Sequence, residues 1–283
     1  MRDTELIVSR MDALLARADA WLDPKPPAVD WQSQAFRWRS GNGGGYMKAV
    51  AHPHEIGLED LAAVEVQKAR LYENTRQFVA GRTANNALLT GARGTGKSSL
   101  IKAVWQAFRH EGLRLIEVEK AHLQDLPEIT DLLFGRPERF IIFCDDLSFE
   151  EGDHGYQALK TVLDGSIAAP SSNVLVYATS NRRHLVPEYF EENAATRHVD
   201  GEVHFSDAVE EKMALSERFG LWLTFYAMDQ DAYLAAVQIW LARLGFGCWD
   251  EEVRREALQW ALARGARSGR VAWQFARDRA GRL

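Results

Sequence analysis

The sequence predicts an α/β fold in which helices cover both faces of a parallel sheet. Two short runs, residues 139–144 and 173–179, are apolar along almost their whole length, which is typical of strands buried on both faces. Segments with helical spacing of apolar residues alternate with such runs, as crossover connections between parallel strands require. In chain order, strands are expected at 86–90, 113–118, 139–144 and 173–179, and helices at 98–105 and 123–134.

Residues 91–98 read G-A-R-G-T-G-K-S and predict a phosphate-binding loop, in the required order of strand, loop and helix. The glycines let successive backbone N–H groups converge on a polyphosphate, and the N-terminus of the following helix adds partial positive charge. Lys97 can reach the terminal phosphates, and the hydroxyl of Ser98 can bind Mg²⁺. A glycine-rich turn between two core elements is the alternative. The residues expected to hold the nucleotide are Gly91, Ala92, Arg93, Gly94, Thr95, Gly96, Lys97, Ser98 and Ser99.

Two acidic residues, Asp145 and Asp146, directly follow the apolar run at 139–144. Phosphoryl transfer needs a Mg²⁺ partner and a residue that orients the attacking water, both at the carboxyl ends of parallel strands. We expect Asp145 to act on Mg²⁺ through water, and Asp146 to act as the base. The alternative for paired acids after a strand is a solvated turn or a helix cap.

The flanking segments predict an N-terminal helix, an extended arm and a C-terminal helical bundle. Apolar residues recur at helical spacing between Ile7 and Leu22, and the prolines from Pro24 onward end that helix. The arm, to about residue 53, mixes tryptophan and phenylalanine with arginine. These aromatics either stack on nucleic-acid bases or, as is commoner, pack on protein. Further helices are expected at 57–80, 209–218, 233–244, 250–264 and 269–278, so the chain divides into residues 1–55, 56–228 and 229–283.

Composition and charge leave most partners open. The chain has 283 residues and a formal net charge of −6, which argues against a surface that binds nucleic acid throughout but allows a local basic patch. Cys144 and Cys248 are too few for a disulfide framework, and a thiol in an apolar strand such as Cys144 is usually inert. The first residues include acids where a signal peptide would be basic and then apolar, and no run approaches a membrane span in length. A cytoplasmic protein without membrane contact is therefore expected.

From about residue 56 onward, the order of these motifs resembles the AAA+ ATPases. In that family a polar first-sensor residue follows the fourth strand, and Asn181 in the run Ala178-Thr179-Ser180-Asn181 is similar to it. Residues 215–221 resemble the segment of the arginine finger, with Arg218 as the finger. Ser268-Gly269-Arg270 resembles the second sensor of the helical lid. The resemblance implies a P-loop NTPase of AAA+ type with a C-terminal lid, ATP and Mg²⁺ as cofactors, assembly into a homo-oligomer, and catalytic roles for Asp146, Asn181, Arg218 and Arg270.

More narrowly, four stretches resemble an uncharacterised bacterial AAA+ family that is filed as domain of unknown function number eight-fifteen. The resemblance extends into the arm, at Phe36-Arg37-Trp38-Arg39. Membership implies ATP binding and leaves the biological role open. The four stretches are residues 94–99, 143–150, 178–185 and 218–222.

One departure from the usual AAA+ pattern bears on turnover. Most members have Glu where this chain has Asp146, and Asp is one methylene shorter, so slow hydrolysis or a role for Glu150 or Glu151 is the alternative. The leading interpretation is an ATPase that couples Mg-ATP binding and hydrolysis to an unidentified protein client, with nucleic acid left open. The competing interpretation is a nucleotide-dependent switch module with little turnover, similar to helicase loaders. A P-loop kinase is disfavoured because no acceptor-pocket motif occurs.

Overall fold

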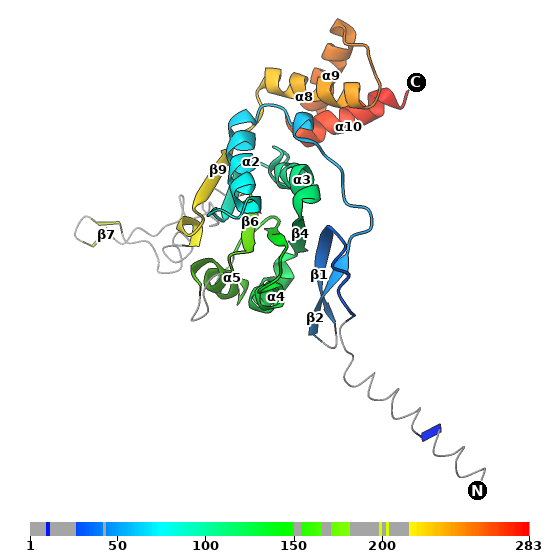
Figure 1. The fold of residues 1–283 in the computed structure, drawn as a ribbon. Helices are drawn as coiled ribbons and strands as arrows, with labels where there is room; N and C mark the ends of the chain where they lie inside the picture. The colour runs from blue at the N-terminus through cyan, green and yellow to red at the C-terminus, as the bar shows by residue number, and fades with distance from the viewer. Residues whose placement is uncertain are drawn as a thin grey trace.

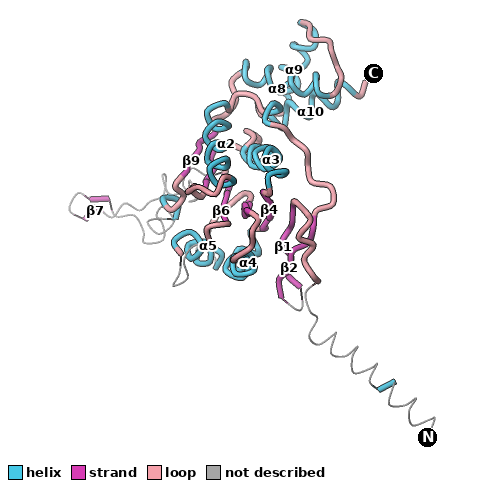
Figure 2. The backbone as a smooth tube through the Cα atoms, viewed as in Figure 1, coloured by secondary structure: helices cyan, strands magenta, loops and turns pink. Residues whose placement is uncertain are grey.

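The structure is a computed structural model that describes residues 10–11, 27–41, 44–149, 154–165, 171–181, 198–199, 202–203 and 215–282 (Figures 1 and 2). The predicted N-terminal helix lies outside these residues except for Arg10 and Met11, which are helical. Glu150, Glu151 and most of the helix predicted at 209–218 also lie outside them. The strands are β1 (Ala35–Gly41), β2 (Gly44–Ala49), β3 (Ala87–Gly91), β4 (Leu113–Val118), β5 (Arg139–Cys144), β6 (Val174–Ser180), β7 (His198–Val199), β8 (Glu202–Val203) and β9 (Leu221–Phe225).

The main sheet has seven strands in the order β2-β1-β4-β5-β6-β3-β9. The neighbouring strands are parallel, except that the edge strand β2 runs antiparallel to β1. The predicted doubly wound parallel sheet is thus confirmed. The register pairs Cys144 of β5 with Ala178 of β6, so the residues that follow each of them lie side by side at the carboxyl edge of the sheet.

Helices cover both faces of this sheet and bury two apolar clusters. On one face, α2 and α3 pack against alternate residues of the central strands, including Leu89, Ile141 and Phe143. On the other face, α4 and α5 pack against the residues between them, such as Ile142 and Cys144. The helices are α2 (Glu65–Val79), α3 (Lys97–Phe108), α4 (Leu126–Leu133), α5 (His154–Asp164), α8 (Gln230–Arg243), α9 (Glu251–Ala263) and α10 (Gly269–Ala280), with 3-10 turns η1 (Leu58–Asp60), η2 (Arg109–Glu111) and η3 (Lys120–Asp125).

The predicted extended arm takes the form of a β-hairpin that joins the sheet. Strand β1 pairs with β4, and the side chains of Phe36 and Trp38 are fully buried against the face that α4 covers. The indole N–H of Trp38 donates to Asp125 Oδ2 at 2.8 Å, so its polar atom is satisfied as a buried indole requires. The expectation that these two aromatics pack on protein is confirmed.

The three C-terminal helices α8, α9 and α10 form a bundle beside α2 and α3 (Figure 1). Tyr233 lies at its centre, and its hydroxyl donates to the carbonyl oxygen of Ala257 at 3.0 Å. Aspartate or serine side chains cap all three helices, by accepting a backbone N–H three residues on. None of the described helices combines the length and apolar character needed to cross a bilayer.

The helix predicted at 57–80 is interrupted between η1 and α2. Ala63 adopts a left-handed conformation with φ of 58°, which an α-helix cannot include. The Asp60 carboxylate stabilises the turn before it by accepting the Gly57 N–H at 2.6 Å, and it also forms an ion pair with Arg243 of α8. That partner lies far along the chain, so periodicity alone does not reveal the break.

Candidate nucleotide-binding site

The phosphate-binding loop connects β3 to α3, in the predicted order. Gly91 has φ of 130°, and a Cβ atom there would lie 1.9 Å from the carbonyl oxygen of Phe225 in β9. A side chain at this position would therefore displace the neighbouring strand. Within the loop, the hydroxyl of Thr95 donates to the carbonyl oxygen of Ala92 at 2.8 Å, and α3 begins at Lys97.

The ammonium group of Lys97 lies inside the loop. It donates to the carbonyl oxygens of Gly91 and Ala92, each at 2.7 Å, and to Oδ1 of Asn181 at 3.1 Å. Burial lowers the pKa of Lys97, and the two carboxylates that follow β5 act in the opposite direction. A cation held this way can exchange carbonyl oxygens for phosphate oxygens, which are better partners for a positive charge.

Asp145 and Asp146 are tied to the adjacent strand by Thr179 of β6. The Thr179 hydroxyl donates to Asp145 Oδ1 at 2.5 Å, and its oxygen accepts the Asp146 backbone N–H at 2.9 Å. Ser98 donates to the same carboxylate oxygen of Asp145 at 2.6 Å, and the side-chain amide of Asn181 donates to Asp146 Oδ1. The structure thus brings the predicted loop, acid-pair and first-sensor residues together. Thr179 was missed by the sequence reasoning, although its position next to Asp145 follows from the strand register.

Asp146 has an unusual backbone conformation, with φ of 53°. Aspartate and asparagine tolerate this left-handed region better than other residues with a side chain, and such strained positions cluster at functional sites. The conformation turns the chain immediately after β5. The strain is compensated by the bonds that Thr179 and Asn181 make to this residue.

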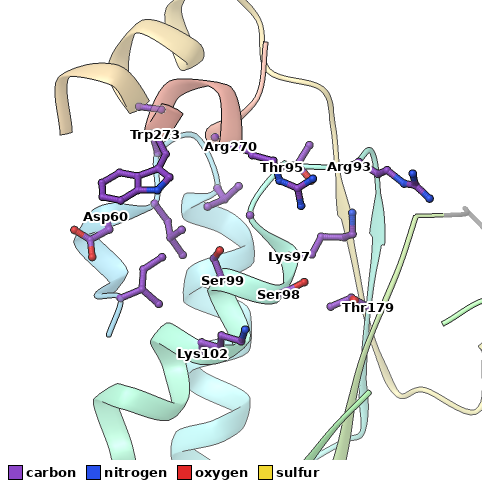
Figure 3. Close-up of a pocket in the computed structure, with 18 of the residues that line it drawn as sticks. Asp60, Arg93, Thr95, Lys97, Ser98, Ser99, Lys102, Thr179, Arg270 and Trp273 are labelled. Atoms are coloured by element: carbon purple, nitrogen blue, oxygen red, sulfur yellow. The ribbon is translucent and has the colours of Figure 1, made fainter. Parts of the chain in front are cut away.

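A direct backbone bond joins the helical bundle to the phosphate-binding loop: Gly269 N–H donates to the carbonyl oxygen of Gly94 at 2.9 Å. Gly94 has φ of 75°, and a Cβ atom there would lie 2.9 Å from Ser268 Oγ. Ser268 caps α10 by accepting the Val271 N–H at 3.3 Å. This contact positions the next residue, Arg270, beside the loop (Figure 3).

A cavity of about 650 Å³ lies between the loop, the segment around η1 and the helical bundle. Its volume is in the range of sites that bind small organic ligands. At one end the rings of Trp240 and Trp273 lie 4.6 Å apart, with Asp60 nearby. Figure 3 shows Lys97 and Arg93 progressively farther from Trp273. Polar lining side chains include Arg93, Thr95, Lys97, Ser98, Ser99, Lys102, Asp145, Asp146, Thr179, Asn181, Arg243 and Arg270.

An ion pair that the sequence analysis did not predict joins two segments that line this cavity. The carboxylate of Asp60 is 5% exposed and pairs with the guanidinium of Arg243. Arg243 also donates to the carbonyl oxygen of Glu55 at 3.2 Å. The segment before α2 is therefore joined to α8, and both border the cavity.

Arg218 lies elsewhere. Its Nε donates to both carboxylate oxygens of Asp164, each at 2.6 Å, at the end of α5. Its side chain is 25% exposed, and among the described residues it is not part of the cavity lining. Of the four residues to which the resemblance assigns catalysis, Asp146, Asn181 and Arg270 share the cavity and Arg218 does not.

The other candidate chemistry finds little support in the part of the chain that the structure describes. No group of three or more His, Cys, Asp or Glu side chains there is arranged to hold a metal ion. Cys144 is fully buried, and burial raises its pKa to about 12, so the thiol stays protonated.

Comparisons with known proteins identify the family to which this chain belongs. Residues 31–283 match the model of the family described as "Protein of unknown function (DUF815)". No curated protein sequence matches the chain. Among solved structures, the chain is similar to the Aeropyrum pernix Orc1 protein in complex with DNA, with a TM-score of 0.50 and 17% sequence identity. This similarity covers 75% of the present chain and 58% of the Orc1 chain, and it concerns the fold alone. The chain therefore belongs to the DUF815 family and has the P-loop NTPase fold of the AAA+ type.

Proposed function

We propose that this protein is an ATPase that binds ATP with Mg²⁺ in the cavity and couples ATP hydrolysis to action on a client. The observation that carries this proposal is the meeting of Lys97, the Ser98–Asp145 pair and the Asn181–Asp146 pair at the end of one phosphate-binding loop. A structural turn needs no lysine buried among carbonyl oxygens, and it needs no second acid held in a strained conformation.

The residues present fit a magnesium ion. Ser98 Oγ and Asp145 Oδ1 are hard oxygen ligands that lie 2.6 Å apart, and Mg²⁺ is usually held by one or two such groups together with phosphates and water. Ser98 would bind the ion directly and Asp145 would act on it through water. When bound, Mg²⁺ neutralises charge on the phosphates.

In the proposed reaction, Asp146 orients the attacking water and accepts its proton, while Thr179 and Asn181 hold Asp146 in place. Lys97 leaves its carbonyl partners to bind the outer phosphates, and Arg270 approaches them from the lid, residues 229–283. The tryptophan pair at the opposite end offers flat aromatic surface for the base. These roles follow from proximity within one cavity and from the chemistry of each group.

We propose further that the protein acts as a homo-oligomer in which Arg218 serves the site of a neighbouring copy. Its position outside its own cavity, and its partial exposure, support this assignment. In the present arrangement the Nε of Arg218 donates to both carboxylate oxygens of Asp164, so a phosphate of the neighbouring site would compete with this carboxylate for the guanidinium.

The test of the ATP site is nucleotide binding by calorimetry with Lys97→Ala, and with Lys48→Ala on the exposed edge of β2 as the matched control. Loss of the Lys97 ammonium should abolish measurable ATP binding, because this ammonium lies among the loop carbonyl oxygens, where it can meet the phosphates. Lys48→Ala should bind like wild type. Wild-type affinity in Lys97→Ala would overturn the site assignment.

A second candidate function is a nucleotide-controlled switch that turns over little. The short acid Asp146 and the engagement of Arg218 by Asp164 both favour slow hydrolysis. Steady-state ATPase rates over a range of protein concentrations separate the two, since an oligomeric ATPase becomes more active per subunit as it assembles. Addition of DNA to the same assay tests nucleic acid as the client; a protein client is the alternative. We place this activity in the cytoplasm, which two free thiols favour.

A further inference from the structure

One arginine sits within the phosphate-binding loop itself. Arg93 follows Ala92 and precedes Gly94, its side chain is exposed, and it lines the cavity. At position 93 a phosphate-binding loop uses its backbone N–H groups, and the motif does not require a cationic side chain there. The residue therefore calls for an explanation beyond the loop motif.

The order of groups along the cavity indicates what Arg93 can reach. In Figure 3, Trp273 lies at one side, and Arg270, Lys97 and Arg93 follow in succession away from it. A nucleotide whose base lies against Trp273 and whose phosphates reach Lys97 would extend its last phosphate toward Arg93. Arg93 is therefore at the end of the cavity that only the longest polyphosphate chain approaches.

The charge of Arg93 is also available for a ligand. Two other cations of the cavity are engaged: Lys97 by loop carbonyl oxygens, and Arg243 by Asp60 and the carbonyl oxygen of Glu55. Among the described residues, no acidic side chain forms an ion pair with Arg93. Its positive charge nevertheless acts on the loop, because it contributes to lowering the pKa of Lys97.

We propose that Arg93 makes the site selective for nucleoside triphosphates over diphosphates by binding the outermost phosphate. This inference rests on the proposed ATP site and adds to it. The N–H groups of the loop bind phosphates that ATP and ADP share, so they contribute to the binding of both nucleotides. Lys97 can reach the outer phosphates, but it lies nearer to the base than Arg93 does. A guanidinium at the far end contributes binding only when the third phosphate is present. Such a charge-assisted hydrogen bond corresponds to a preference of about 10-fold to 100-fold.

The experiment compares the dissociation constants of ADP and of a non-hydrolysable ATP analogue, both with Mg²⁺, by calorimetry. The variants are Arg93→Gln, which removes the charge, and Arg93→Lys, which keeps it. Arg70→Gln, an exposed arginine of α2 outside the cavity, is the matched control. We expect Arg93→Gln to weaken binding of the analogue about 10-fold or more and to leave ADP unchanged. Arg93→Lys should retain most of the preference, and Arg70→Gln all of it.

Two results would overturn the inference. One is wild-type binding of both ligands by Arg93→Gln, and the other is an equal loss for both ligands, which would mean that the substitution distorts the loop. These results differ from a failure of the proposed function, in which the wild-type protein would bind neither nucleotide. Thermal melts of the three variants establish that each is folded, as an exposed side chain leads us to expect.

Discussion

Thr179→Val is the substitution for which the structure gives the sharpest expectation. Valine has nearly the shape of threonine but neither donates nor accepts, so both bonds to the acid pair are lost at once. Thr179 is 1% exposed and lies in the core, whereas the two acids that it bonds are exposed. The bond to the Asp145 carboxylate is worth about 1.5–3 kcal/mol, and the one from the Asp146 N–H about 0.5–1.5 kcal/mol. The free energy of unfolding should therefore fall by about 2–4 kcal/mol.

Urea unfolding measures this loss. With a slope of about 2–3 kcal/mol per molar, the midpoint should shift by about 1 M at unchanged slope. Thr179→Ser keeps the hydroxyl and should recover most of the loss. Thr130→Val is the control, because that hydroxyl makes a single bond to the Pro127 carbonyl oxygen and is partly exposed. If Thr179→Val unfolds at the wild-type midpoint, the two bonds from Thr179 to Asp145 and Asp146 do not contribute to stability. ATP turnover by Thr179→Val should also fall, because the Asp146 N–H loses its bond to the Thr179 hydroxyl.

Four further expectations concern the site and the thiols. Asp146→Asn should bind ATP but not hydrolyse it, since the amide suits the left-handed backbone yet cannot accept a proton; normal turnover would show that another group is the base. Arg218→Ala should bind ATP and be inactive, and mixing it with Lys97→Ala should restore some hydrolysis; no recovery in mixed assemblies would mean that Arg218 acts in its own subunit. Because burial lowers the pKa of Lys97 below its ordinary value of 10.5, the ammonium deprotonates at a lower pH than that of an exposed lysine, and ATP affinity should decline with it as the pH rises; a decline that starts only above 10.5 would contradict this. In the folded protein a thiol reagent should label Cys248 and spare the buried Cys144, and labelling of both would refute the burial.

The parts of the site that local sequence determines were predictable. The glycines of residues 91–96 predict backbone positions that have positive φ or lie close to other chain segments. Gly91 and Gly94 show both features. Strands β4 and β5 occupy the predicted residues, because strands buried on both faces leave a continuous apolar signal. The acids after β5 follow from the same pattern.

The parts that depend on distant pairing were not predictable from one sequence. The arm becomes a hairpin because β1 finds the free edge of β4, some 80 residues away, where Arg37 bonds Glu117 at 2.7 Å. Helix α5 and strand β9 were not predicted, and with them the pairing of Arg218 with Asp164 was missed. The link between Asp60 and Arg243 joins segments that periodicity treats as unrelated.

The hairpin of β1 and β2 has a practical consequence for dissecting this protein. The sequence suggests a cut near residue 55, before the nucleotide-binding part, but the sheet and its apolar core cross that point. A shortened protein that starts at residue 56 would lose Phe36 and Trp38 from the core. It would also leave the edge of β4 unpaired, and an unpaired strand edge promotes aggregation. Limited proteolysis or domain expression should therefore treat residues from about Ala35 onward as part of the folded unit.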